Sequence, residues 1–298
     1  MTLEDRTDVV VVGGGNAGFS AAIAAAERGR RVVLLEKANR AARGGNSYYT
    51  AGAFRITHDG LHDIGDLIEP DDRHTATDLP SYTPSDFQLD MKRVTNGRND
   101  QMLTDVLVGN GTDTLRWLQG HGLRFRLMYE RQAYPDATGR QRFWGGLAVG
   151  SVGGGIGLIE QHAAAAARLS VEVRYEAAGR SLLIEEDTVH GVVYEDAEGQ
   201  PVELRADSVI LAAGGFEADA QMRREYLGEG WERAKVRGNP LNTGDMLRAG
   251  RDGGAVRRLE HVPQCRLGCQ RSRDWQPYPD QPTDARRLLP GHRCQCEW

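Results

Sequence analysis

Residues 9–18 read VVVVGGGNAG, and this stretch decides the fold. Four consecutive valines are typical of a parallel strand that is buried on both faces, so we predict a strand from Asp8 to Val12 that turns at the three glycines. The small residues that follow predict a helix over 16–28, and residues 31–35, which are apolar after Arg31, predict the next strand. A strand, a helix and a second strand with short connections form a βαβ unit, which indicates an α/β fold with a mostly parallel sheet.

The glycines of this stretch have the spacing of a phosphate-binding turn. Gly13, Gly15 and Gly18 form Gly-x-Gly-x-x-Gly. The first permits a tight turn, the second lets backbone amides approach a pyrophosphate, and the third lets helix and strand pack closely. Glu36 ends the second predicted strand, where its carboxylate can accept both hydroxyls of an adenosine ribose and disfavours a 2′-phosphate. The sequence therefore predicts a dinucleotide site.

The rest of the chain predicts further elements of the same α/β fold. Helices are predicted at 85–96, 101–120, 156–168, 219–227 and 243–249. Strands are predicted at 123–128, 171–175 and 208–212. Alternation of apolar and polar residues predicts a small antiparallel meander at 181–185, 189–194 and 201–204. Residues 59–84 are polar and without a regular period, which predicts a long surface excursion.

Three later segments distinguish FAD from NAD as the dinucleotide. Arg43–Gly52 is rich in glycine and hydroxyl residues, and its small side chains let backbone groups reach an isoalloxazine ring. The strand at 208–212 ends in Ala213-Gly214-Gly215, and Asn242-Thr243-Gly244-Asp245 begins a helix whose N-terminus can face the polar edge of a flavin. An NAD domain that only transfers hydride needs no such loop.

Together these segments resemble the FAD-binding domain of the fumarate reductase and succinate dehydrogenase flavoprotein family. The segments that carry the resemblance are 9–18, 44–47, 50–55, 143–146 and 237–245. The likeness covers about residues 7–255, and within the family it is greatest to tricarballylate dehydrogenase. It implies a Rossmann-like fold of the glutathione-reductase type with a central parallel sheet and the small meander.

The resemblance also implies which residues hold the FAD. The glycine turn would meet the pyrophosphate, Glu36 the ribose, the loop at 44–52 the flavin, Gly179 the adenine, and Asp245 the region of the ribityl chain. The implied set is Gly13, Gly15, Asn16, Ala17, Gly18, Glu36, Lys37, Gly44, Gly45, Asn46, Ser47, Thr50, Ala51, Gly52, Gly179, Ala213, Gly214, Asn242, Thr243 and Asp245. Met246 departs from the family, which often has glycine there.

Candidates for substrate contact lie next to the predicted flavin-binding segments. Arg55 and His58 can hold a carboxylate, and a solvated loop pair is the alternative. Arg237 and Asn239 precede the Thr-Gly-Asp run, where a polar loop around a proline explains them equally well, and Trp144 either walls the pocket or packs in the core. In the family a capping domain and a final FAD-domain segment that returns to the sheet supply the proton-moving arginine and the groups that grip carboxylates. Neither is recognisable in this sequence, so the catalytic residues stay unassigned.

The activity implied by the resemblance is dehydrogenation of a small polycarboxylate, of the tricarballylate-to-cis-aconitate type, by hydride transfer to FAD. The implied partners are a small carboxylate substrate and an electron-acceptor protein. Alternatives are a related flavin dehydrogenase acting on fumarate, succinate or a 3-ketosteroid, and a catalytically incomplete FAD-binding fragment.

The C-terminal residues differ in composition from the rest. All four cysteines lie at 265–296, among many arginines and prolines, so we divide the chain into an FAD-binding domain at 1–255 and an irregular tail at 256–298. The Cys and His spacing there matches no common zinc pairing, and we predict no metal site. We interpret the tail as truncated or frame-shifted, with Leu259 onward suspect, because residues 289–298 can be back-translated so that the next reading frame reads as a strand and turn.

Charge and hydropathy exclude two classes of partner. The 298 residues are 40% hydrophobic and carry a net charge of −5, with a pI near 5.9, which argues against nucleic-acid binding. No apolar run approaches the length of a membrane span, and Glu4 and Asp5 stand where a signal peptide has basic residues. We therefore predict a cytoplasmic protein.

Overall fold

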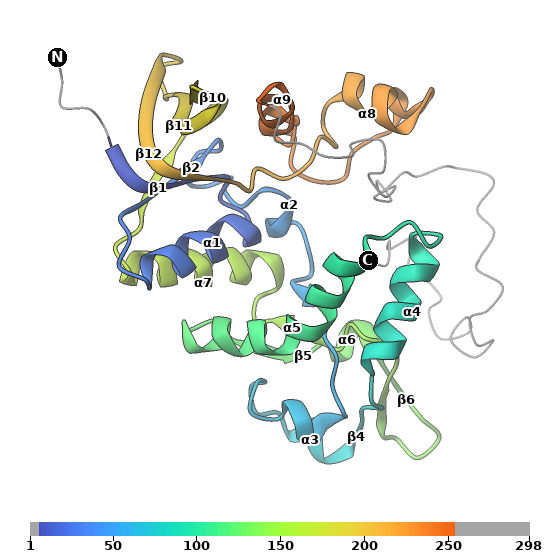
Figure 1. Ribbon diagram of the computed structural model, residues 1–298. Coiled ribbons are helices and arrows are strands. Elements are labelled where there is room, and N and C mark those ends of the chain that lie inside the picture. The colour runs from blue at the N-terminus through green and yellow to red at the C-terminus, as the bar shows by residue number, and fades with distance from the viewer. Residues whose placement is uncertain (1–5, 254–298) are drawn as a thin grey trace.

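A six-stranded sheet in the order β10-β11-β12-β1-β2-β9 dominates the upper part of the computed structural model, which describes residues 6–253 (Figure 1). Its strands are β1 (Arg6–Val12), β2 (Val32–Glu36), β9 (Glu172–Tyr175), β10 (Ala178–Glu185), β11 (Thr188–Glu195) and β12 (Pro201–Leu211). The neighbours β12, β1, β2 and β9 are parallel, whereas β10, β11 and the first half of β12 are antiparallel. The predicted α/β class is confirmed.

The valine run forms the centre of this sheet because both faces are covered. Val9 and Val11 belong to the core beneath the sheet, whereas Val10 and Val12 belong to a second core on the opposite face with Tyr194. Successive side chains of a strand point to opposite faces, so an unbroken apolar run suits a strand with two buried faces.

Two predicted strands are one. Residues 201–204 and 208–212 were expected as a meander strand and a separate parallel strand, but β12 runs unbroken through both. Its first half pairs antiparallel with β11, and its second half pairs parallel with β1. Between the two predicted strands, Arg205 donates a hydrogen bond to Glu185 of β10 and Asp207 accepts one from Arg6 of β1. The meander is therefore part of the main sheet.

Two helices cover the lower face of the sheet, α1 (Asn16–Ala26) and α7 (Gly154–Arg168), and they pack side by side (Figure 1). Helix α1 can approach β1 closely because Gly18 has no Cβ. A Cβ at this position would overlap the carbonyl oxygen of Gly13. The opposite face carries α9 (Asp245–Asp252) against β10. It is preceded by α8 (Ala220–Leu227) and the 3-10 turn η2 (Trp231–Arg233).

The lower part of the molecule is built from short strands and two longer helices, α4 (Pro84–Val94) and α5 (Gln101–Gly120). Helix α4 begins at a capping box between Thr83 and Asp86, and the Asp100 side chain caps α5. Two three-stranded sheets lie here, β3-β8-β5 and β4-β7-β6. Their strands are β3 (Ala53–Phe54), β4 (Thr77–Asp78), β5 (Phe125–Leu127), β6 (Ala133–Pro135), β7 (Gln141–Phe143) and β8 (Val149–Ser151). The short helices of this part are α3 (Leu61–Ile64), η1 (Asp72–Ala76) and α6 (Tyr129–Gln132), whereas α2 (Gly45–Tyr48) lies against α7.

The segment expected as a surface excursion, 59–84, contains α3, η1 and β4. Its side chains Ile64, Leu67 and Leu79 are buried in the hydrophobic core, so the segment contributes to the core and is not only a surface excursion. The predicted tail at 256–298, with its four cysteines and Leu259, lies outside the described residues. Between residues 6 and 253, no helix has the length and apolarity to cross a bilayer, and no group of side chains has the make-up of a metal site.

Candidate cofactor site

A cavity opens where β1, β2 and β12 end, at the carboxyl edge of the parallel strands. This edge is the usual ligand site of an open α/β sheet. Six separate segments line the cavity: 12–17, 35–37, 44–47, 177–179, 212–214 and 239–246. Every predicted cofactor residue lies in its wall except Gly18, Thr50, Ala51 and Gly52.

The turn between β1 and α1 requires glycine at position 13. Gly13 has φ +109°, and a Cβ there would strike the backbone of Ala212. Gly15, in contrast, has extended backbone and caps α1, and the nearest atom to a Cβ built on it is Ser47 Oγ at 3.4 Å. The space in front of the α1 N-terminus is therefore open on the cavity side, which fits a pyrophosphate held by helix amides.

Glu36 lies in this wall and is only 6% exposed. Its Oε2 accepts a hydrogen bond from Gly14 N at 2.9 Å, and its Oε1 accepts one from Ala38 N at 2.8 Å. The carboxylate thus ties the turn after β1 to the turn after β2. Each carboxylate oxygen has a second lone pair, so both can still accept a ribose hydroxyl.

Gly14 is a residue that the sequence analysis missed. The Gly-x-Gly-x-x-Gly pattern allows any residue at position 14, but a Cβ there would lie 2.5 Å from Glu36 Oε2. Its place in the middle of three consecutive glycines, together with the acid at position 36, was the signal that could have identified it.

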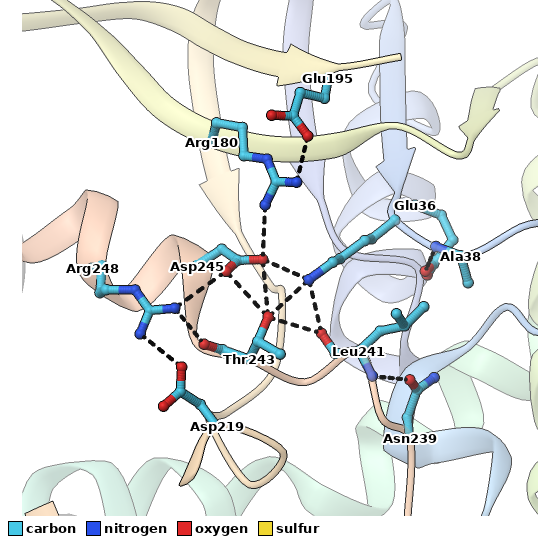
Figure 2. A network of polar contacts seen from close by, with 11 residues as sticks. Glu36, Ala38, Arg180, Glu195, Asp219, Asn239, Leu241, Thr243, Asp245 and Arg248 are labelled. Carbon is cyan, nitrogen blue, oxygen red and sulfur yellow. Dashed lines mark hydrogen bonds and ion pairs between the residues drawn. The ribbon is translucent and has the colours of Figure 1, made fainter. Parts of the chain in front are cut away.

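Lys37 and Asp245 close one edge of the cavity. Lys37 Nζ lies 2.7 Å from Asp245 Oδ2 and donates to Thr243 Oγ1 at 2.8 Å. Figure 2 shows Asp245 between Arg180 and Arg248, which lie 3.6 Å and 3.4 Å from its oxygens. Burial raises the pKa of Asp245, but the hydrogen bond and charge of Lys37, with Thr243 and Arg180, outweigh burial and hold it below the usual value. The carboxylate is therefore ionised and anchors the segment that begins α9.

The loop at 44–47 joins the cavity to the segment before α9. Ser47 Oγ accepts a hydrogen bond from Asn16 N at 3.1 Å, at the start of α1. Asn46 Oδ1 accepts one from Asn239 N at 2.9 Å. Asn239, a candidate for substrate contact, is buried in the cavity wall and also caps the turn at Leu241.

The four predicted residues outside the cavity pack against backbone. Gly155 N, at the start of α7, donates to Thr50 O at 3.1 Å. Gly52 has φ +73°, and a Cβ there would overlap Ser151 Oγ. Residues 50–52 therefore lie against the start of α7, and Gly18 lies against the β1 turn.

The remaining substrate candidates also lie outside the cavity wall. Arg55 donates to Tyr82 Oη and Asp90 Oδ2 at 2.8 and 2.7 Å. His58 is buried, and burial lowers its pKa despite nearby Asp63 and Asp59, so its ring is neutral. Trp144 is 40% exposed, and Arg237 is exposed one residue before Gly238.

Comparison with known proteins assigns the class. A family model described as "FAD binding domain" matches residues 8–269. The chain therefore belongs to this family, the FAD-binding domain of fumarate reductase and succinate dehydrogenase flavoproteins, and its cofactor is FAD. The family comprises FAD-dependent oxidoreductases that act on carbon–carbon bonds.

Individual relatives match over most of this chain. A fumarate reductase (cytochrome) from Shewanella frigidimarina is 30% identical over 220 residues, which cover 71% of this chain and 34% of that protein. A urocanate reductase from Eggerthella lenta is 30% identical over 235 residues, 75% of this chain and 34% of its own length. The chain thus spans about a third of the length of these curated relatives.

Among solved structures, a 3-ketosteroid-Δ4-(5α)-dehydrogenase from Rhodococcus jostii RHA1 superposes with a TM-score of 0.65 at 21% identity. The match covers 86% of this chain and 56% of that chain. This similarity supports the fold. The predicted family and cofactor are confirmed, while the likeness to tricarballylate dehydrogenase stays a prediction.

Proposed function

We propose that this chain holds the FAD of an oxidoreductase that dehydrogenates a small polycarboxylate, of the tricarballylate-to-cis-aconitate type. The observation that carries the proposal is the cavity itself. Its wall combines an open helix N-terminus, a buried carboxylate and glycine-rich backbone from six segments at one edge of the sheet. Relatives named for the reduction of fumarate and urocanate support chemistry at a carbon–carbon bond.

In this proposal each wall segment has a separate task. When bound, FAD would supply the acceptor for a hydride from a carbon next to the substrate carboxylate, while a base takes the proton of the neighbouring carbon and leaves a carbon–carbon double bond. The N-terminus of α1 binds the pyrophosphate through its amides and its partial positive charge. Glu36 accepts the ribose hydroxyls, and the Lys37–Asp245 pair holds residues 241–246 against the cavity and limits access of water.

In this proposal Arg237, rather than Arg55 or His58, binds the substrate carboxylate. Arg55 is already paired with Asp90, and neutral His58 is buried away from the cavity. Arg237 is exposed and forms no hydrogen bond with residues 6–253. It adjoins Gly238, where a Cβ would lie 2.5 Å from Asn46 Oδ1 in the cavity wall. A planar guanidinium there can bind a carboxylate with two parallel hydrogen bonds.

The test is an anaerobic titration of the purified full chain loaded with FAD. Tricarballylate is expected to bleach the visible flavin band, while succinate and a 3-ketosteroid at equal concentration are the comparison substrates. Arg237→Ala should raise the tricarballylate concentration needed for bleaching about tenfold, and exposed Arg233→Ala is the matched control. Bleaching by succinate or the steroid alone would contradict the polycarboxylate assignment, and a colourless protein after addition of FAD would contradict the whole proposal.

A second candidate function is an FAD-binding module that does not turn over by itself. Its supporting observation is that none of Arg55, His58 and Arg237 lines the cavity. A yellow protein that no tested substrate bleaches is the result expected from this alternative. The small carboxylate substrate, an electron-acceptor protein and a cytoplasmic location all stay parts of the proposal.

A further inference from the structure

A fully buried histidine lies behind the N-terminus of α1. His162 projects from α7, is 0% exposed, and stacks on Phe19 with ring centroids 5.8 Å apart. Its Nε2 lies 2.8 Å from Asn16 Oδ1, and its Nδ1 has no hydrogen-bond partner among the described residues. The only polar contact of this ring in that part of the chain is therefore Asn16, the first residue of α1.

The protonation state of His162 follows from its surroundings. Burial lowers its pKa to about 4, so the ring is neutral near pH 7 and carries one N–H. A carbonyl oxygen can only accept, so Nε2 carries the proton and donates to Asn16 Oδ1. The reverse arrangement would bury an N–H at Nδ1 without an acceptor and turn the amide oxygen toward an incoming phosphate, and both changes are unfavourable.

Asn16 itself faces the ligand. It lines the cavity, and its backbone N–H is held by Ser47 Oγ. Its Nδ2 amide forms no hydrogen bond with residues 6–253 and is not buried, so this group is accessible to solvent at a residue that lines the cavity. Because Oδ1 is held from behind, the two protons of Nδ2 are directed to the open side.

We propose that His162 is a positioning residue that fixes the side-chain amide of Asn16 so that its NH₂ group donates to a phosphate oxygen of FAD. This role rests on FAD binding in the cavity described above. His162 does not touch the cofactor and acts only through Asn16. A hydrogen bond to a charged acceptor is among the stronger ones in proteins, so its loss should weaken FAD binding about tenfold.

A double-mutant cycle on the full chain tests this role, with the FAD dissociation constant measured by quenching of flavin fluorescence. His162→Phe keeps a ring against Phe19 but removes the donor, and Asn16→Ala removes the amide. Each single variant is expected to raise the Kd about tenfold, and the double variant should bind no worse than Asn16→Ala. A His162→Phe variant with unchanged Kd, or single effects that add fully in the double variant, would overturn the proposal.

Further variants separate positioning from a general loss of structure. His162→Gln restores an N–H donor and is expected to recover part of the affinity, which a merely structural role would not produce. Exposed His62→Phe on α3 is the control and should leave the Kd unchanged. If His162→Phe does not fold, Asn16→Asp decides, because its second oxygen would face the phosphate and should weaken FAD binding more than Asn16→Ala does. Wild-type affinity in Asn16→Asp would overturn the proposal, whereas a wild-type chain that binds no FAD would instead contradict the proposed function.

Discussion

Two glycine-rich loops look alike in the sequence, 13–18 and 44–52, yet the structure uses their glycines in two different ways. Gly15 and Gly45 leave space on the side of the cavity. Gly18 and Gly52 instead let two pieces of backbone approach each other, and Gly44 makes room for Ile159 of α7. The difference shows that a glycine motif contains residues that serve the ligand and residues that serve packing. Substitutions that add a single Cβ distinguish the two kinds.

The largest effect is expected at Gly18, the packing glycine of the first loop. Gly18→Ala places a Cβ on the Gly13 carbonyl oxygen, which belongs to backbone and cannot move aside. We expect a loss of more than about 3 kcal/mol in the free energy of unfolding, measured by urea denaturation. Gly109→Ala in exposed α5, where nothing lies within 4 Å, is the control and should stabilise by about 0.5–1 kcal/mol. Equal stability of the two variants would contradict the packing role.

Gly52 should behave as the packing glycine of the second loop. Gly52→Ala adds a Cβ at φ +73° that overlaps Ser151 Oγ and approaches the backbone of Gly154 at 2.8 Å. We expect a loss of about 2–4 kcal/mol in the free energy of unfolding, while the folded fraction keeps its FAD Kd. Urea denaturation and flavin fluorescence measure the two quantities. Weaker FAD binding with an unchanged free energy of unfolding would instead show that Gly52 serves the ligand rather than packing.

Glu36 serves both packing and the ligand, because it accepts hydrogen bonds from the turns after β1 and β2 and also lines the cavity. Glu36→Gln replaces one acceptor oxygen with an NH₂ group, which must then face the N–H of either Gly14 or Ala38. We expect a loss of about 1–3 kcal/mol in the free energy of unfolding of the apoprotein and weaker FAD binding. Exposed Glu198→Gln is the matched control. If only the Kd changes, the hydrogen bonds to the turns do not stabilise the fold.

Gly15 is the sharpest test of the ligand class. Gly15→Ala fits the extended backbone, with its nearest neighbour at 3.4 Å, so the free energy of unfolding should change by less than about 0.5 kcal/mol. The added methyl group enters the space before the α1 amides, and the FAD Kd should rise about tenfold. Titration followed by flavin fluorescence measures it. Loss of stability with unchanged Kd would reverse the assignments of Gly15 and Gly18.

The smallest effect concerns the ion pair at the cavity edge. Although burial raises the pKa of Asp245, Lys37 and its other partners hold it below the usual value in the folded chain. Its pairing therefore stabilises the fold fully above about pH 4 and is lost as the pH falls through the folded pKa. Lys37→Met should cost about 1 kcal/mol at pH 6 and less at pH 3, as measured by urea denaturation. A cost that does not depend on pH would indicate lost packing rather than lost charge.

Local pattern made much of the fold predictable. The valine run, the glycine turn and the acid at the end of the second strand all lie within residues 8–36, where period and spacing act between near neighbours. The division of β12 was predicted wrongly because its polar residues pair across the sheet with Glu185 and Arg6, and such partners cannot be read from neighbouring sequence.

The cofactor site shows the same limit. Most predicted residues line the cavity because they belong to motifs. Gly14 was missed because its need for glycine comes from Glu36, 22 residues away. His162 was missed because its hydrogen-bond partner Asn16 lies 146 positions earlier in the chain. Arg55 has the chemistry of a carboxylate ligand, but only the fold reveals that Asp90 already occupies it.

The sequence by itself determined the strand–turn–helix unit, the FAD cofactor and the family, because these depend on motifs, and the residues of each motif lie close together in the chain. The tertiary structure decided which glycines face the ligand and which face backbone. That choice depends on what a Cβ would meet, and at Gly44 and Gly52 the atoms concerned belong to Ile159, Ser151 and Gly154, about a hundred residues later.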